Sequence, residues 1–164
     1  MKYTLSVSVE NQPGVLSKVS GLFSRRGFNI DSLAVGETED PSISCITIVV
    51  DGDEHIVEQV EKQLNKVIQV IKVRNLTEHG NFLACELALI KVNCNNKQRT
   101  EIMQIAGTMR AKVVDVATNS ITLQIAAESE RIEALTNLLR PYGIKESVCT
   151  GTIAMERGTI RSKK

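Results

Sequence analysis

The stretch VENQPGVLSKV, residues 9–19, marks the point where a β-strand gives way to an α-helix. Before it, apolar and polar side chains alternate over residues 3–9, which predicts a strand with one buried face. The basic pair Arg25 and Arg26, followed by Gly27, predicts where the helix ends. Between these points the apolar residues follow helical spacing: Val15, Leu16, Val19, Leu22 and Phe23.

The rest of the first half adds two strands, a helix and a strand, so its order is β-α-β-β-α-β. The predicted ranges of these four elements are 28–40, 41–53, 53–66 and 67–76. A turn at Asp40 and Pro41 separates the two strands. The helix is predicted from an apolar stripe on Ile56, Val57, Val60 and Leu64.

The same six elements recur in the second half at an offset of about 80 residues. We therefore expect an α+β protein of two ferredoxin-like βαββαβ domains, each with a four-stranded antiparallel sheet and two helices on one face. The predicted boundaries are 1–77 for the first domain, 78–81 for a polar linker, 82–151 for the second domain and 152–164 for a basic tail without secondary structure.

Each sheet is expected to leave one face without helices. On the first strand this face carries Thr4, Ser6 and Ser8, which water can solvate, whereas Val49 places an apolar side chain on it. Open faces and unpaired strand edges favour association with a second copy. The sequence therefore predicts a homodimer formed through the sheets or helices of like domains.

The composition excludes several classes of function. A formal net charge of +1 gives no field to steer nucleic acid or anionic lipid. Aromatic residues make up 3% of the chain and Trp is absent, so a surface for stacking bases is not expected. No apolar run has the length of a membrane span, and the N-terminus lacks the apolar region of a signal peptide. We expect a soluble cytoplasmic protein that binds neither nucleic acid nor membrane.

The sequence also lacks the motifs of catalytic and metal sites. The histidines His55 and His79 are far apart, and there is no nucleophile elbow, zinc-protease motif or phosphate-binding loop. The carboxylates Glu37 and Glu39 fall where a turn is expected, which favours solvated side chains. The cysteines show no CxxC spacing and are interpreted as reduced thiols: Cys45, Cys85, Cys94 and Cys149. No metal site and no enzymatic role of the chain alone are predicted.

Two other classes of protein share this expected fold. A transcription regulator would need a helix-turn-helix, and none is visible before or after the predicted sheets. An RNA-binding module would need aromatic side chains on its central strands. Here Phe23 lies on a predicted helix, and the other aromatic residues fall at the ends of elements: Tyr3, Phe28, Phe82 and Tyr142.

The Pro-Gly junction of the opening stretch allows two interpretations. The first amide groups of a helix lack intrahelical acceptors and favour an anion, and Gly14 would let a ligand approach the backbone. Alternatively, Asn11 caps the turn and Gly14 only permits its shape. Asn29 and Asp31, after the helix, either contact an ammonium group or are polar residues at a strand edge.

Residues 2–77 resemble the ACT domain of the small regulatory subunit of acetohydroxyacid synthase, also called acetolactate synthase. The motifs that carry the resemblance are ENQPGVLSKVSGLFSRRGFNIDSL and VEKQLNKVIQVIKV. The second half fits the same family more loosely, through LALIKV and DVAT. Where the family often has Ser or Ala, this chain has Pro13, which suits the first turn of a helix.

The resemblance implies a non-catalytic subunit that activates the large catalytic subunit and confers feedback inhibition by valine. Thiamine diphosphate, FAD and Mg would be bound by the large subunit and not by this chain. Residues 81–150 are expected to serve dimer stability and contact with the large subunit. The alternative is a stand-alone ACT-type amino-acid sensor that acts on another enzyme or on a transcription regulator. The valine-binding residues carried over from the family, shared between two copies of the chain, are Asn11, Gly14, Val15 and Leu16 from one copy and Asn29 and Ile30 from the other.

Overall fold

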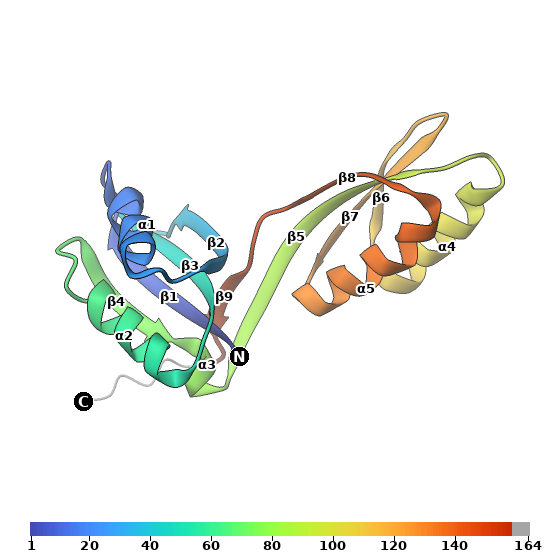
Figure 1. Ribbon diagram of the computed structural model, residues 1–164. Coiled ribbons are helices and arrows are strands. Elements are labelled where there is room, and N and C mark those ends of the chain that lie inside the picture. The colour runs from blue at the N-terminus through green and yellow to red at the C-terminus, as the bar shows by residue number, and fades with distance from the viewer. Residues whose placement is uncertain (159–164) are drawn as a thin grey trace. The chain divides into compact units, whose positions relative to one another are not determined.

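The computed structural model describes residues 1–158 and divides the chain into two compact units (Figure 1). The first unit comprises Met1–Leu83 together with the chain from Thr152 onward, and the second comprises Ala84–Gly151. The predicted fold class is confirmed, because each unit has the order β-α-β-β-α-β. None of the helices within residues 1–158 is long and apolar enough to cross a membrane.

The first unit is an antiparallel sheet of order β2-β3-β1-β4 with α1 and α2 on one face (Figure 1). The strand β2 is therefore an edge strand. The helix α2 begins after Asp53, whose side chain accepts a hydrogen bond from the Ile56 amide at 2.9 Å. The bounds of the elements are β1 (Lys2–Glu10), α1 (Val15–Arg26), β2 (Ile30–Glu37), β3 (Ile43–Asp51), α2 (Glu54–Leu64) and β4 (Val70–Asn75).

The core of the first unit lies between the sheet and its two helices. Leu5 pairs with Ile48 and Val7 with Ile46, so the apolar faces of β1 and β3 coincide. Phe23 on α1 is 1% exposed and is among the largest fully buried side chains. The alternation on β1 and the apolar stripe on α1 predicted these positions, because one face of each element must leave water.

The helix-free face of the first unit is partly covered by the C-terminal segment. The amide of Thr152 donates to Ser32 Oγ at 2.9 Å, and Glu156 lies 3.9 Å from Arg74 across the same face. Between these contacts β9 (Ile153–Glu156) pairs with β5 (Phe82–Asn93). The prediction of an unstructured tail over residues 152–164 is therefore wrong for 153–156, and residues 159–164 lie outside the described part of the chain.

The linker predicted at residues 78–81 also differs from the structure. A short helix, α3 (Leu76–His79), follows β4 directly and ends at Gly80 in the left-handed region. Thr77 in this helix accepts a hydrogen bond from the Thr4 amide at 2.9 Å. As a result Thr4 and Val49, predicted to lie on an open face, are each 8% exposed.

The second unit repeats the plan in an antiparallel sheet of order β6-β7-β5-β8, with α4 and α5 on one face (Figure 1). Ile90, Leu123 and Leu135 are fully buried between the sheet and the helices. The helix-free face keeps Leu89 and Val148 41% and 57% exposed. The elements are α4 (Gln98–Met109), β6 (Lys112–Val116), β7 (Ser120–Ala127), α5 (Ser129–Leu139), the 3₁₀ turn η1 (Arg140–Tyr142) and β8 (Ile144–Cys149).

Candidate functional site

The junction between β1 and α1 leaves backbone donors free. Gly14 precedes the helix with φ 85° and ψ −6°, a left-handed conformation that favours glycine, and no side chain caps the helix. The first intrahelical bond runs from Lys18 N to Gly14 O at 3.1 Å. Within residues 1–158, no acceptor faces the amides of Gly14, Leu16 and Ser17. These three donors, at the positive end of a helix, suit a carboxylate.

Asn11 ties this junction to the hairpin between β2 and β3. Its amide N–H donates to Ser42 O at 2.8 Å. Its side-chain Nδ2 donates to the Pro41 carbonyl at 2.9 Å and to Glu37 Oε1 at 3.1 Å. Both side-chain hydrogens are therefore used, and Oδ1 remains as an acceptor. An acceptor at this position suits an ammonium group better than a carboxylate.

The hairpin that receives Asn11 is held by its own side chains. Asp40 accepts hydrogen bonds from the Ser42 hydroxyl at 2.7 Å and from the Ser42 amide at 3.0 Å. These bonds lower the pKa of Asp40 below its usual value, the hydroxyl having the larger effect. The fixed turn keeps the carbonyls of Pro41 and Ser42 facing Asn11, so the orientation of the asparagine is determined before any ligand arrives.

Two neighbouring residues of the predicted site have different environments. Val15 is 4% exposed and packs in the core of the first unit, so it can offer a ligand only its backbone. Its amide already makes a long hydrogen bond of 3.4 Å to Gln12 O. Leu16 is 43% exposed on the first turn of α1 and is free to contact an apolar ligand group.

Asn29 and Ile30 do not join the other four residues within one chain. They lie at the start of β2, whereas Glu37, which contacts Asn11, lies at its end. Seven steps along a strand span about 23 Å, which is more than a free amino acid can bridge. Asn29 donates to Asp31 at 2.9 Å, and Ile30 packs against the core. The structure thus brings together Asn11, Gly14, Val15 and Leu16 only.

A cavity of about 610 Å³ lies at the other end of β1 from this junction. Tyr3, Val57, Asn75 and Glu61 are among the residues that line it. Burial raises the pKa of Glu61 above its usual value of 4.5, and the charges of Glu78 and Glu58 add to this, while a hydrogen bond to Asn75 acts in the opposite direction.

This raised pKa makes the stability of the first unit depend on pH. The folded protein holds the Glu61 proton more tightly than the unfolded chain, so this contribution to stability is present below pH 4.5 and lost as the pH rises through the folded-state pKa. We expect Glu61→Gln to reduce the fall in stability between about pH 4 and about pH 7. Urea unfolding of the intact chain at several pH values measures this pH dependence of the free energy of unfolding. The exposed Glu133→Gln should keep the wild-type pH dependence, and equal curves for Glu61→Gln and wild type would contradict the assignment.

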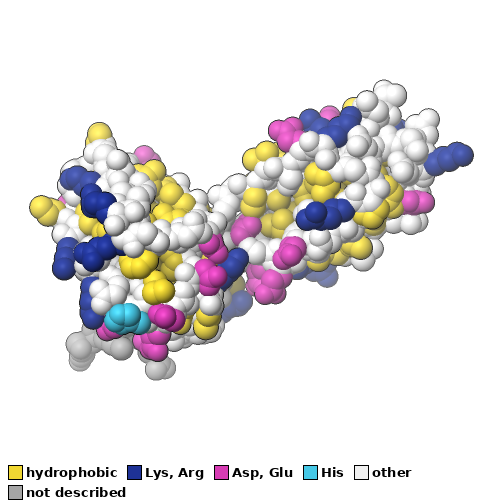
Figure 2. Space-filling model, in the orientation of Figure 1, with side chains coloured by type: hydrophobic (Ala, Val, Ile, Leu, Met, Phe, Trp, Pro, Cys, Tyr) yellow, Lys and Arg dark blue, Asp and Glu magenta, His cyan; other side chains and the backbone are white. Residues whose placement is uncertain are grey.

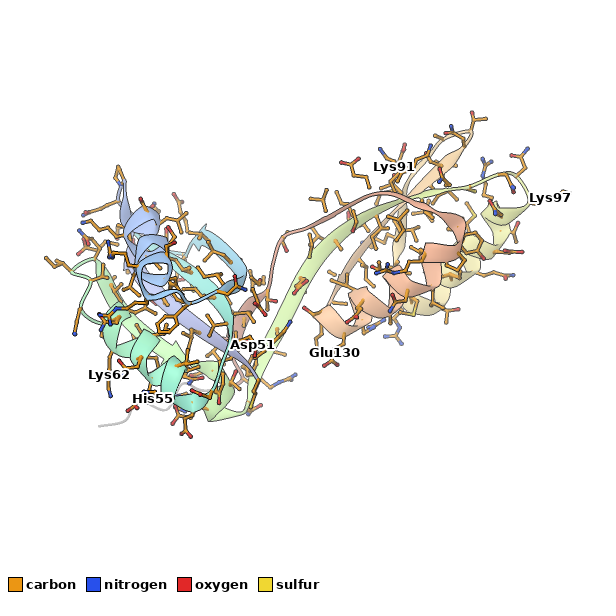
Figure 3. All side chains as sticks on the ribbon, viewed as in Figure 1. Asp51, His55, Lys62, Lys91, Lys97 and Glu130 are labelled. Carbon is orange, nitrogen blue, oxygen red and sulfur yellow. The ribbon has the colours of Figure 1, made fainter. Side chains whose placement is uncertain are left out.

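Reactive side chains are dispersed. His55 is exposed at the start of α2 (Figure 3), and His79 lies at the end of α3. Burial and a hydrogen bond to Glu86 at 3.0 Å raise the pKa of the Cys149 thiol, which disfavours the nucleophilic thiolate. Among residues 1–158, no group of three or more His, Cys, Asp or Glu side chains could hold a metal ion.

Comparison with known proteins shows to which family the two units of the chain are related. Residues 5–72 match a family model described as an AHAS small subunit-like ACT domain, and residues 85–158 match one described as the small subunit of acetolactate synthase. The chain belongs to the acetolactate synthase small-subunit family. The resemblance inferred from the sequence is therefore confirmed, and the Gly14 junction lies inside the ACT domain of this family member.

Individual relatives agree with this assignment over nearly full lengths. A probable acetolactate synthase small subunit of Archaeoglobus fulgidus is 49% identical over 158 residues, which is 96% of this chain and 98% of the relative. The acetolactate synthase small subunit of Mycolicibacterium smegmatis is 50% identical over 156 residues, covering 95% and 91%. The crystal structure of the small subunit from Thermotoga maritima superposes with a TM-score of 0.88 at 39% identity, covering 98% and 99%.

Sequence reasoning on this small-subunit family member missed Glu37, which was interpreted as a solvated turn residue. Its contact with Asn11 joins residues 26 positions apart. That contact depends on the register in which β2 pairs with β3, with Glu37 opposite Ser44. Neither residue carries a local sequence signal for the other, so no pattern could have found the pair.

Proposed function

We propose that this chain is the regulatory subunit of an acetolactate synthase. It binds the large catalytic subunit, raises its activity and makes the enzyme sensitive to valine. Thiamine diphosphate, FAD and Mg are held by the large subunit, and the assembly acts in the cytoplasm. The observation that carries the proposal is the Gly14 junction, where three amides lack acceptors within the described residues of an ACT domain.

Each part of a valine molecule has a matching group at this junction. The carboxylate is held by the amides of Gly14, Leu16 and Ser17, where the helix dipole adds to the attraction. The ammonium group is held by Oδ1 of Asn11, whose two hydrogens already face Glu37 and Pro41. The isopropyl group packs on Leu16. Alanine lacks two of these carbons and should bind more weakly by on the order of 1.6 kcal/mol.

A second copy completes the site. Since β2 is an edge strand, two copies can pair their β2 strands antiparallel. That pairing places Asn29 and Ile30 of one copy beside the Glu37 end of the other, which removes the separation of about 23 Å found within one chain. Valine is then shared between the copies, and its binding depends on their homodimer.

Regulation follows from this shared position. A ligand shifts a conformational equilibrium only if it binds one state more tightly than the other. Valine between two ACT domains favours the arrangement in which both halves of the site are close, and the large subunit responds to that arrangement. Loss of the valine site should therefore remove inhibition and leave the activation that comes from subunit association.

Reconstitution with the large subunit of the same organism tests the proposal. We expect the two chains to purify together, the activity to exceed that of the large subunit alone, and valine to inhibit only the reconstituted enzyme. Alanine at the same concentration serves as the control ligand and should inhibit less. Failure of the chains to associate, or activity independent of this chain, would refute the proposed role.

A further inference from the structure

The turn between α2 and β4 exposes an isoleucine to solvent. Ile68 in this turn is 90% exposed, and Ile71, the second residue of β4, is 54% exposed. Consecutive Cα atoms are about 3.8 Å apart, so the Cα atoms of these two residues lie within about 11 Å of each other. A single exposed apolar side chain is common on protein surfaces, whereas two in one short segment form a candidate contact surface.

Hydrogen bonds hold the turn on both sides of Ile68. The amide of Val67 donates to Leu64 O at 3.1 Å, and the amide of Val70 donates to Val67 O at 3.0 Å. The side chains of Val67 and Val70 pack against the core of the first unit. The core thus takes up the neighbours of Ile68 and leaves this isoleucine outside at a fixed place. An anchor that is already positioned loses little conformational entropy when it binds a partner.

The strand edge beside this turn is unpaired within the described part of the chain. β4 lies last in the order β2-β3-β1-β4, at the opposite edge from β2. Consecutive residues of β1 pair with Val70 and Lys72, so Ile71 between them is the extra residue of a β-bulge. A bulge obstructs the addition of a regular strand. A partner would therefore contact this edge through side chains, with the two isoleucines entering an apolar groove.

The charged residues of segment 66–72 are both positive. Lys66 and Lys72 are exposed, and neither forms an ion pair within residues 1–158. Lys and Arg side chains gather along the left side of the first unit (Figure 2), where Figure 1 places the loop between α2 and β4. A surface of this kind suits a partner whose apolar groove is bordered by carboxylates.

We propose that segment 66–72 is a contact surface for the catalytic large subunit, with Ile68 as its central anchor. This inference rests on the function proposed above, because it names a surface through which that association occurs. The segment lies within VEKQLNKVIQVIKV, one of the motifs that carry the resemblance to the small-subunit family. The core explains the valines of this motif, and the valine site uses none of its residues. Contact with the catalytic subunit gives its two exposed isoleucines a function.

A second copy of the chain fits this surface poorly. The charged residues of β4 are Lys72 and Arg74, so two β4 strands side by side would bring only positive charges together in any register. Arg74 already lies 3.9 Å from Glu156 of its own chain. The homodimer proposed above uses β2, at the opposite edge of the sheet, which leaves segment 66–72 free for the large subunit.

Association kinetics of the full-length chain with the large subunit test this surface. Ile68→Ala should raise the dissociation rate constant on the order of tenfold, because the complex loses its anchor. Ile68→Leu keeps the apolar contact and should stay close to wild type. Because Ile68 is 90% exposed, its truncation should leave the free energy of unfolding nearly unchanged, so an altered rate reports the contact and not the fold.

Charge reversal gives a second signature on the other rate constant. Lys66→Glu should lower the association rate constant on the order of tenfold at low salt and by less at high salt. Arg26→Glu is the matched control, because Arg26 is an exposed basic residue in the last turn of α1, outside this segment. We expect it to change the association rate constant much less.

The outcomes separate this inference from the proposed function. A wild-type chain that does not associate with the large subunit refutes the proposed role and this surface together. Association of the wild type with unchanged rate constants for Ile68→Ala overturns the surface and leaves the proposed role standing. An effect of Arg26→Glu as large as that of Lys66→Glu also overturns it, because the charge effect would then not be specific to segment 66–72.

Discussion

Valine inhibition should be abolished by Gly14→Asp, while activation of the large subunit is retained. The new carboxylate would lie at the amides of Gly14, Leu16 and Ser17 and would repel the carboxylate of the ligand. The charge-assisted hydrogen bonds that are lost contribute about 1.5–3 kcal/mol each, so valine affinity should fall by on the order of 100-fold or more. Inhibition curves of the reconstituted enzyme measure the change.

Gly14→Ala separates the charge effect from backbone strain. A side chain at φ 85° costs about 1–2 kcal/mol of stability in either variant. A Cβ at Gly14 meets no atom within 4 Å, so alanine itself blocks nothing within the chain. We expect alanine to change valine affinity less than about tenfold, since the amides remain free. Normal inhibition of the aspartate variant, or equal loss in both variants, would contradict an anion site at these amides.

Phe23→Ala should be the most destabilising single substitution in the first unit. Phe23 is 1% exposed between α1 and the sheet, and its truncation leaves a cavity among residues that cannot collapse fully. We expect the free energy of unfolding to fall by about 3–5 kcal/mol. Ile68→Ala is the control, because Ile68 is 90% exposed and should contribute less than about 0.5 kcal/mol.

Hydrogen exchange measured by mass spectrometry locates this effect within the chain. Exchange in β1, β3 and α1 should accelerate in Phe23→Ala, because their amides are protected by packing in the same core. Peptides of β5 beyond Ala84 and of β7 report the second unit and should change much less, since its core is separate. Uniform acceleration across both units would contradict two separate cores.

The elements that sequence patterns predicted well are those fixed by local rules. The alternation of Leu5 and Val7 with serines defined β1, and the stripe containing Val19 and Phe23 defined α1. The sequence places Gly14 at a strand-to-helix junction, and its positive φ is a backbone conformation that favours glycine at such a turn. Each of these signals depends only on residues a few positions apart in the sequence, so it can be recognised in a single sequence.

The features that the sequence did not reveal depend on distant contacts. In β9 the apolar residues Ile153 and Met155 are 58% and 66% exposed. The apolar face of this strand is therefore not buried in a core, and the usual pattern for predicting a strand does not apply to it. The segment is fixed by Ser32 and Arg74, 120 and 82 positions away from Thr152 and Glu156 respectively (152 − 32 and 156 − 74). The cover over Thr4 and Val49 could not be anticipated for the same reason.

The proposed valine site contains both a part that the sequence predicts and a part that it does not. Asn11, Gly14, Val15 and Leu16 lie within the short stretch 11–16, so the sequence alone could group them around the Gly14 junction. The orientation of Asn11 by Glu37 and Pro41 required the register of the β2–β3 hairpin. The distance between this junction and Asn29 required the length of β2 as well, and because of this distance the proposed site includes a second copy.

The central claim is that the free amides at the start of α1 bind valine. The most direct measurement is a titration of valine into the isotopically labelled protein, followed at individual backbone amides by nuclear magnetic resonance. We expect the signals of Gly14, Leu16 and Ser17 to shift with a common midpoint between about 1 μM and about 1 mM, together with those of Asn29 and Ile30. Saturating valine that leaves these amide signals unmoved, or that shifts only signals elsewhere in the chain, would contradict the account.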